Sequence, residues 1–160
     1  MTAAQWSVVT LETVLRPARI DDLPAILRYE RDYIRTIEPE SAPGWTESVD
    51  KNLALWIECL PTTVVLEVPG SGDADPAGFA MWLVEDSAAT LVTIQVARHH
   101  RRAGLGRRLL EAFEERAAAD GAHVLRLGVH VDNPARALYE RAGWDVTGTD
   151  GDYVLFERRV

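Results

Sequence analysis

The hydrophobic pattern at the start of the chain predicts a short strand followed by a helix. The strand is expected at Val14–Ala18. After it, Asp21 or Asp22 can cap a helix that has Pro24 in its first turn and ends near Pro39. Apolar residues recur at helical spacing along this segment, at Ile26, Leu27, Ile34 and Ile37.

The next segment predicts a loop, a second helix and a strand. Residues 38–45 contain two prolines and a glycine, which favours a loop. Thr46 can cap the helix, whose apolar face is expected to hold Val49, Leu53, Trp56, Ile57 and Leu60. The β-branched run Thr62–Val68 predicts a strand, and residues 69–76 are rich in turn-forming residues.

Strands and a helix alternate in the centre of the chain. Phe79–Val84 and Leu91–Val96 predict two further strands of a meander, and Val124–Val129 predicts a buried strand. Between them lies a helix that should end near Asp120-Gly121. Its apolar face consists of Leu105, Leu109, Leu110, Phe113 and Ala117.

The end of the chain completes a mixed fold. A last helix is expected to open at Asn133-Pro134 and to end at Gly143, and Asp145–Thr147 and Tyr153–Phe156 predict a closing hairpin. This order of elements predicts one α/β domain over residues 1–160. Its centre should be a mixed, mostly antiparallel sheet of about seven strands, flanked by about four helices.

The composition narrows the class of protein. A chain of 160 residues buries about 70% of its surface on folding, so it needs no disulfide or metal to fold. The single cysteine, Cys59, is expected in the core. No apolar run approaches the roughly 20 residues of a membrane helix, and Met1–Thr10 has no signal-peptide pattern. We therefore expect a cytoplasmic protein without membrane contact, in which only the first ten residues and Gly70–Asp75 lack regular order.

The charge is acidic overall and basic at one place. The net charge of −8 argues against nucleic acid as a partner. Five arginines nevertheless lie between residues 98 and 108, which contain no acid, so the remaining 12 basic side chains face 25 acidic ones and carry a net charge of −13. A positive patch in an acidic chain predicts a small anionic ligand.

The turn after Leu91–Val96 carries the strongest chemical signal. Gly104 and Gly106 lack Cβ atoms, so a phosphate can approach the backbone N–H groups at the helix start. The helix dipole adds about half a positive charge there. Guanidinium donors come from Arg101, Arg102 and Arg107. The alternative is an ordinary helix start with solvated arginines.

Other glycine-rich phosphate loops fit this turn less well. A P-loop requires a lysine and then Ser or Thr after its second glycine, where this chain has Arg107-Arg108. A dinucleotide-binding turn requires a third glycine or alanine, where this chain has Leu109.

The spacing Arg101-x-x-Gly104-x-Gly106 resembles the acetyl-coenzyme A signature of the GCN5-related N-acetyltransferase (GNAT) superfamily. The resemblance covers Leu91–Trp144 and, before it, the order of elements. It implies a GNAT fold that binds the pyrophosphate of acetyl-CoA at the signature amides and its pantetheine arm at the end of the preceding strand. The implied cofactor-binding residues are Ile94, Gln95, Val96, Arg101, Arg102, Ala103, Gly104, Leu105, Gly106, Arg107, Asn133, Ala135 and Tyr139.

The same resemblance implies a catalytic role for Tyr139. Family members have a tyrosine six residues after an asparagine, here Asn133, and before a pair such as Gly143-Trp144. Attack of an amine on the thioester gives a tetrahedral intermediate, and the departing thiolate, whose thiol has a pKa of about 8.5, needs a proton that a phenol can donate. The alternatives are that Tyr139 packs in the core and that Asn133 caps its helix.

The general base stays open. The glutamates familiar in the superfamily are replaced by Thr90 and Gly128, which disfavours histones and ribosomal N-termini as substrates. The remaining candidates are Glu85, Asp86, His130 and a chain of water molecules.

The acceptor pocket of this fold lies along the first two helices. There the resemblance points to Tyr29, Glu30, Tyr33, Glu38 and Trp45, unless these belong to an ordinary exposed acidic face. The net charge favours a small cationic or neutral primary amine. The alternative functions are acetylation of a protein N-terminus or lysine, and binding of CoA without catalysis. Besides the amine, the expected partner is a second copy of the chain in a homodimer.

Overall fold

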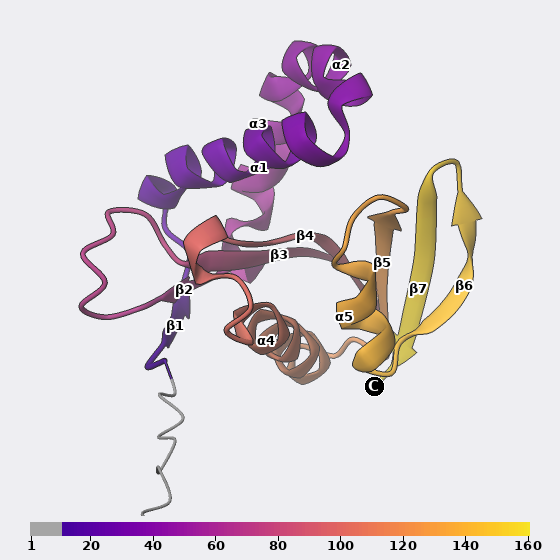
Figure 1. The fold of residues 1–160 in the computed structure, drawn as a ribbon. Coiled ribbons are helices and arrows are strands. Elements are labelled where there is room, and N and C mark those ends of the chain that lie inside the picture. The colour runs from indigo at the N-terminus through magenta and orange to yellow at the C-terminus, as the bar shows by residue number, and fades with distance from the viewer. Residues whose placement is uncertain (1–10) are drawn as a thin grey trace, which may run out of the picture.

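The computed structural model describes residues 11–160, so the expectations for Met1–Thr10 lie outside the described residues. A seven-stranded sheet forms the centre, in the order β1-β2-β3-β4-β5-β7-β6 (Figure 1). Neighbouring strands are antiparallel except β4 and β5, which are parallel. The predicted mixed, mostly antiparallel sheet is confirmed. Its strands are β1 (Val14–Pro17), β2 (Val64–Glu67), β3 (Gly78–Glu85), β4 (Ala88–Val96), β5 (Val124–His130), β6 (Asp145–Asp150) and β7 (Tyr153–Arg159).

Helices cover both faces of the sheet. Figure 1 shows α1, α2 and α3 on one face and α4 on the other. The short helix α5 lies on the α4 side, because its Tyr139 belongs to the same buried cluster as Phe113 of α4. No helix within residues 11–160 combines the length and apolar character needed to cross a membrane. The helices are α1 (Leu23–Ile37), α2 (Ala42–Glu47), α3 (Val49–Cys59), α4 (Leu105–Ala119) and α5 (Arg136–Arg141).

The central strands are buried on both faces, in two separate cores. Successive side chains of a strand point to opposite faces. In β3, Ala80 and Trp82 therefore face the core under α4, whereas Phe79 and Met81 face the core under α1 and α3. This is why the strand is an almost continuous apolar run in the sequence.

The segment after α1 differs from its prediction. Residues 38–45, expected as a loop, hold the 3₁₀ turn Pro39–Ser41 and the beginning of α2, so there are five described helices instead of about four. Proline suits the first turn of a helix, and both prolines of this segment occupy such positions. Thr46 caps no helix. It lies inside α2, where its hydroxyl donates to the carbonyl of Ala42 at 2.8 Å.

The buried side of α3 is also rotated from the predicted one. Leu53 and Ile57 are exposed, and the buried stripe runs through Trp56 and Cys59, which pack against the sheet. The prediction that Cys59 is a core residue is confirmed.

The N-terminus of α1 uses its aspartates in an unexpected way. Asp22 does not cap the helix through its side chain. Its carboxylate accepts hydrogen bonds from the Arg16 guanidinium at 2.8 Å and from the Arg19 backbone amide at 2.7 Å. Burial alone would raise the pKa of Asp22, but these donors hold it below its usual value. The pair ties the edge strand β1 to α1.

The sheet opens between β4 and β5. Their pairing joins only Ala88–Thr90 to Val124–Arg126. Two residues further along β4, the register with β3 shifts. Leu91 lies opposite Trp82 and Thr93 lies opposite Met81, so Val92 between them has no partner in β3. Such a β-bulge bends its strand. The rest of β4 therefore diverges from β5, and the space between them is called the wedge below (Figure 1).

Candidate active site

The start of α4 follows the diverging end of β4. Gly104 is the N-cap of this helix and has a φ of +77°, in the left-handed region. A Cβ placed on Gly104 would meet no atom within 4 Å. At Gly106 a Cβ would lie 3.5 Å from the Leu138 side chain, so this glycine allows α4 to approach α5. The space beside Gly104 is therefore open, and it lies at the positive end of the α4 dipole, where the first helical amides have no partner within the helix.

The arginines around this helix start divide into two groups. Arg102 is exposed and has a φ of +64°, and Arg101 donates from Nε to the Val96 carbonyl at 3.1 Å. Arg107 forms an ion pair with Glu111 at 2.8 Å one turn further along α4, and Arg108 donates to the Thr13 hydroxyl. Arg108 is thus directed toward the segment before β1, whereas Arg101 and Arg102 stay in the turn before the helix.

Tyr139 lies on α5, in the core under α4. Only 4% of this residue is exposed, and its ring packs against Trp144 and Phe156 at centroid distances of 6.3 and 5.9 Å. Among residues 11–160, no group hydrogen-bonds its hydroxyl. Burial raises the pKa of Tyr139, so the phenol keeps its proton at neutral pH. A protonated phenol fits the predicted role of Tyr139 as a general acid. The alternative prediction, that Tyr139 packs in the core, also describes its ring.

Asn133 connects the turn after β5 to α1. Its Oδ1 accepts a hydrogen bond from the Ala135 backbone amide at 2.9 Å, just before α5 begins at Arg136. Its Nδ2 donates to the Tyr33 hydroxyl at 3.4 Å. The N-cap of α5 is Ala135, and no side chain caps this helix, so the capping alternative for Asn133 is wrong. Asn133 instead holds the turn before α5 and reaches across to the helix on the acceptor side.

Glu30 projects from α1 onto the part of β4 that lies beyond the bulge. Its Oε1 accepts hydrogen bonds from the Thr93 hydroxyl at 2.5 Å and from the Gln95 amide at 3.1 Å. Burial raises the pKa of Glu30, the two donors lower it, and the nearby charge of Glu38 raises it, with a net increase. Glu30 is thus a carboxylate that holds a proton more readily than an exposed glutamate does.

Glu38 is the centre of a second cluster. It is 6% exposed, and its two oxygens accept hydrogen bonds from different phenols: Tyr33 of α1 at 2.8 Å and Tyr153 of β7 at 2.6 Å. Burial and the hydrogen bond to Glu38 raise the pKa of both tyrosines, so the phenols remain donors. The cluster joins the end of α1 to the strand next to β5.

Two predicted acceptor residues have packing roles. Tyr29 donates its hydroxyl to the Pro76 carbonyl at 2.6 Å, and its ring stacks on Phe79 at 6.0 Å. The ring centroid of Trp45 lies 6.5 Å from that of Trp56, and Trp45 packs against the core under α1 and α3. Of the five predicted acceptor residues, Glu30, Tyr33 and Glu38 therefore remain as candidates, and the side of the site that they form is called the acidic side.

The candidate bases lie at opposite ends of the wedge. Glu85 pairs with Ala88, and Asp86 lies in the following turn, where β4 is still joined to β5. His130 is the last residue of β5, at the open end. Its Nδ1 accepts a hydrogen bond from the Asp132 backbone amide at 3.2 Å, and its ring lies edge-on to Tyr153 at 5.5 Å.

Sequence reasoning missed Tyr153 and Thr93. Tyr153 lies 115 residues from Glu38 in the chain, and only the pairing of β7 with β5 brings it to the site. Thr93 could be found only by recognising that alternation fails in Leu91-Val92-Thr93-Ile94, because two neighbouring residues of a bulge point to one face.

Comparisons with known proteins bear on the family and the fold of the chain. The sequence model described as the Acetyltransferase (GNAT) family matches residues 29–144. A search of curated protein sequences finds no significant match.

Several solved structures share the fold. The PaiA N-acetyltransferase from Thermoplasma acidophilum, in complex with coenzyme A, is 20% identical with a TM-score of 0.77, over 93% of this chain and 99% of that one. The ribosomal-protein-S18-alanine N-acetyltransferase from Escherichia coli is 20% identical with a TM-score of 0.65, over 93% and 94%. A nourseothricin acetyltransferase is 30% identical with a TM-score of 0.53, over 61% and 64%.

Proposed function

Because the chain belongs to the GNAT family of acetyltransferases, we propose that it transfers the acetyl group of acetyl-CoA to the primary amine of a small cationic or neutral molecule. The divergence of β4 and β5 beyond Thr90 is the observation that carries this proposal. In the described residues no strand pairs with the β5-facing edge of β4 after that point, which supports pairing of a pantetheine arm with backbone groups within Ile94–Val96. At Val96 the arm would have to share or replace the hydrogen bond that the carbonyl accepts from Arg101.

The start of α4 fits the pyrophosphate of the same molecule. The absence of any atom within 4 Å of a Cβ at Gly104 supports close approach of a phosphate there, and the amides of Leu105 and Gly106 would supply donors. Arg101 and Arg102 add positive charge beside them. Acetyl-CoA supplies the activated acetyl group, and the chain supplies position, protons and charge.

We assign the acid to Tyr139 and the base to Glu30. The raised pKa of Tyr139 keeps a proton for the leaving sulfur. Glu30 contacts Thr93 and Gln95 on the diverging part of β4, where an acceptor amine would meet the acetyl group. Its raised pKa makes it a better proton acceptor near neutral pH than an ordinary glutamate, directly or through one water molecule.

The acceptor should carry positive or no charge. Glu30 and Glu38 bring two carboxylates to one side of the site, and the donors around Glu38 are neutral phenols. An uncompensated negative charge in a partly buried cleft attracts cations and repels carboxylates. This supports polyamines, aminoglycosides and aryl amines over acidic amino acids.

The test is release of free thiol from acetyl-CoA with a panel of acceptors. Polyamines, aminoglycosides and aryl amines are compared with aspartate, glutamate and a lysine-containing peptide. We expect turnover with at least one cationic or aryl amine. Preferential turnover of aspartate or glutamate would refute the assignment of the acceptor, and preferential turnover of the peptide would favour a protein substrate. Absence of any acetyl-CoA-induced rise in Tm at millimolar concentration would refute acetyl-CoA binding itself.

A further inference from the structure

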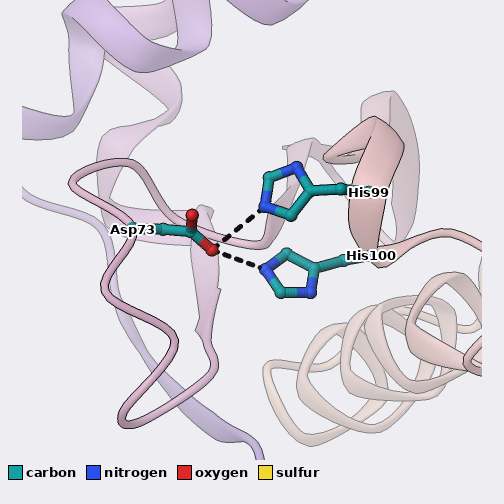
Figure 2. A group of neighbouring side chains, drawn as sticks. All are labelled: Asp73, His99 and His100. Atoms are coloured by element: carbon teal, nitrogen blue, oxygen red, sulfur yellow. Dashed lines mark hydrogen bonds and ion pairs between the residues drawn. The ribbon is translucent and has the colours of Figure 1, made fainter.

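A cluster of two histidines and one aspartate lies outside the wedge. Asp73 belongs to the β2–β3 connection, and His99 and His100 belong to the 3₁₀ turn Arg98–His100 that follows β4 (Figure 2). One oxygen of Asp73, Oδ2, lies 3.0 Å from Nε2 of His99 and 2.8 Å from Nε2 of His100. Figure 2 shows both rings directed toward this carboxylate. All three candidate ligand atoms lie within 4.8 Å of one another.

The local backbone brings these side chains together. Gly70 and Gly72 have φ values of +77° and +78°, which lets the connection turn back toward the end of β4. The two imidazole rings lie side by side, with centroids 4.2 Å apart. His100 is largely enclosed, with 12% of its side chain exposed, whereas His99 is 61% exposed. The cluster therefore has a buried side and a side open to solvent.

We propose that Asp73, His99 and His100 bind a divalent transition-metal ion, with Zn²⁺ as the preferred occupant. Tetrahedral zinc with ligand distances of about 2.0–2.1 Å separates its ligands by about 3.3 Å. The observed separations of 2.8 and 3.0 Å lie a few tenths of an ångström below that value. Two imidazole nitrogens and one carboxylate oxygen suit zinc, nickel and copper, and they select against magnesium and calcium. The open side leaves room for a water molecule as the fourth ligand.

The position of the site suggests what the metal does. Asp73 and His99 line the same cavity as Val96 and Arg101, the end of β4 and the turn before α4. A metal ion here clips the β2–β3 connection onto the segment that leads to the helix start. Its role is to stiffen this segment, so metal binding should be measurable as stability without any acceptor or acetyl-CoA present.

The experiment uses the full chain without an affinity tag, after treatment with a chelator. Zn²⁺ is titrated by calorimetry, and thermal unfolding is followed with Zn²⁺ and with Mg²⁺. We expect one Zn²⁺ per chain and, at about a hundredfold excess over Kd, a Tm rise of about 5–10 °C that Mg²⁺ does not give. Co²⁺ in place of Zn²⁺ should give visible absorption bands.

Variants locate the metal. Asp73→Asn and His100→Ala should each weaken Zn²⁺ binding about tenfold or more, because even groups that only orient metal ligands cost 10- to 100-fold. His123→Ala is the matched control, because His123 is exposed and lies at the far end of α4. If Asp73, His99 and His100 only form hydrogen bonds with one another, the variants would be less stable than the original chain, and the original chain would show no saturable Zn²⁺ binding. That result, or equal binding in all four proteins, overturns the proposal.

Discussion

At Tyr139 the ring and the hydroxyl have different surroundings. The ring packs against Trp144 and Phe156, whereas none of residues 11–160 hydrogen-bonds the hydroxyl. Removing the oxygen therefore leaves the packing intact and deletes only a proton donor. This separation allows catalysis and stability to be tested independently at one residue.

Tyr139→Phe should lower turnover by roughly 10²–10⁴-fold, the range of a lost general acid. The Kd for acetyl-CoA and the Tm should change little, since the ring remains. Thiol release under single-turnover conditions measures the chemical step, and isothermal titration measures binding. A single-turnover rate equal to that of the original chain would assign Tyr139 to packing alone.

At Glu30, unlike at Tyr139, the group proposed to serve catalysis is expected to lower the stability of the folded protein. Because folding raises the pKa of Glu30, its charged form is disfavoured in the folded state, and the folded protein loses stability as pH rises past the usual pKa of a glutamate, about 4.3. A neutral amide at this position keeps hydrogen-bonding atoms for Thr93 and Gln95 without that penalty. The carboxylate is thus expected to cost stability and to serve catalysis.

Glu30→Gln should lower kcat/KM by about 10²-fold or more and raise the Tm at pH 7. In the original chain, kcat/KM should rise with pH through an ionisation above the ordinary glutamate range, and the variant should lack this rise. Glu40→Gln, at an exposed glutamate in the turn before α2, is the control and should change neither quantity. Retention of the ascending limb in Glu30→Gln would exclude Glu30 as the base.

Among the helices, α4 has a glycine with a positive φ at each end, so the same substitution can be compared at its beginning and at its end. Gly104 precedes it and Gly121 follows it, with φ values of +77° and +99°. A Cβ at either position would meet no atom within 4 Å. The same substitution therefore imposes a similar backbone strain at both ends, of about 1–2 kcal/mol, but only one end is proposed to face the pyrophosphate.

Gly104→Glu should abolish the Tm rise that acetyl-CoA produces, because it places a side chain and a negative charge over the helix start. Gly121→Glu should lower the Tm of the free protein by a similar amount and keep the response to acetyl-CoA. Thermal unfolding with and without the cofactor measures both effects. Loss of the response in both variants would mean that the helix start has no special role.

Local patterns predicted most of these elements but not their contacts. The seven strands were expected from apolar and β-branched runs between turn-forming residues, and the turn before α4 from its glycines and arginines, all of which are local features of the sequence. The helix α2 was missed because prolines were taken to end helices, although they also begin them. Glu38 was expected near the acceptor, but its contact with Tyr153 depends on the pairing of distant strands, which no local pattern contains.

Across the whole molecule, the part of the chain outside one small basic turn carries a net negative charge. Outside residues 98–108 the chain carries 12 basic and 25 acidic side chains. Exposed charges interact over about 8 Å at physiological ionic strength and over longer distances in dilute salt. A cationic acceptor should therefore be drawn toward the acidic side of the site before it makes any contact.

The KM for a cationic acceptor should rise several-fold between 20 mM and 300 mM NaCl, while the KM for a neutral aryl amine should stay nearly constant. Steady-state kinetics at saturating acetyl-CoA measure both. Equal salt dependence for the two acceptors would show that the charge around the cleft does not select the substrate.

The bulge at Val92 separates what the fold of this protein requires from what the proposed binding of a ligand requires. Before the bulge, Ala89 and Leu91 face the core under α4, and after it Ile94 packs against that same core. Leu91 lies opposite Trp82 and Thr93 opposite Met81, so removing Val92 would leave a regular alternation in which no side chain changes face. A chain shortened by this one residue should keep the core under α4 and lose only the contact of Val92 with the core under α1 and α3, while β4 runs straight alongside β5. The proposed ligand space would then depend on the length of one strand, and the shortened chain would keep the architecture without that space.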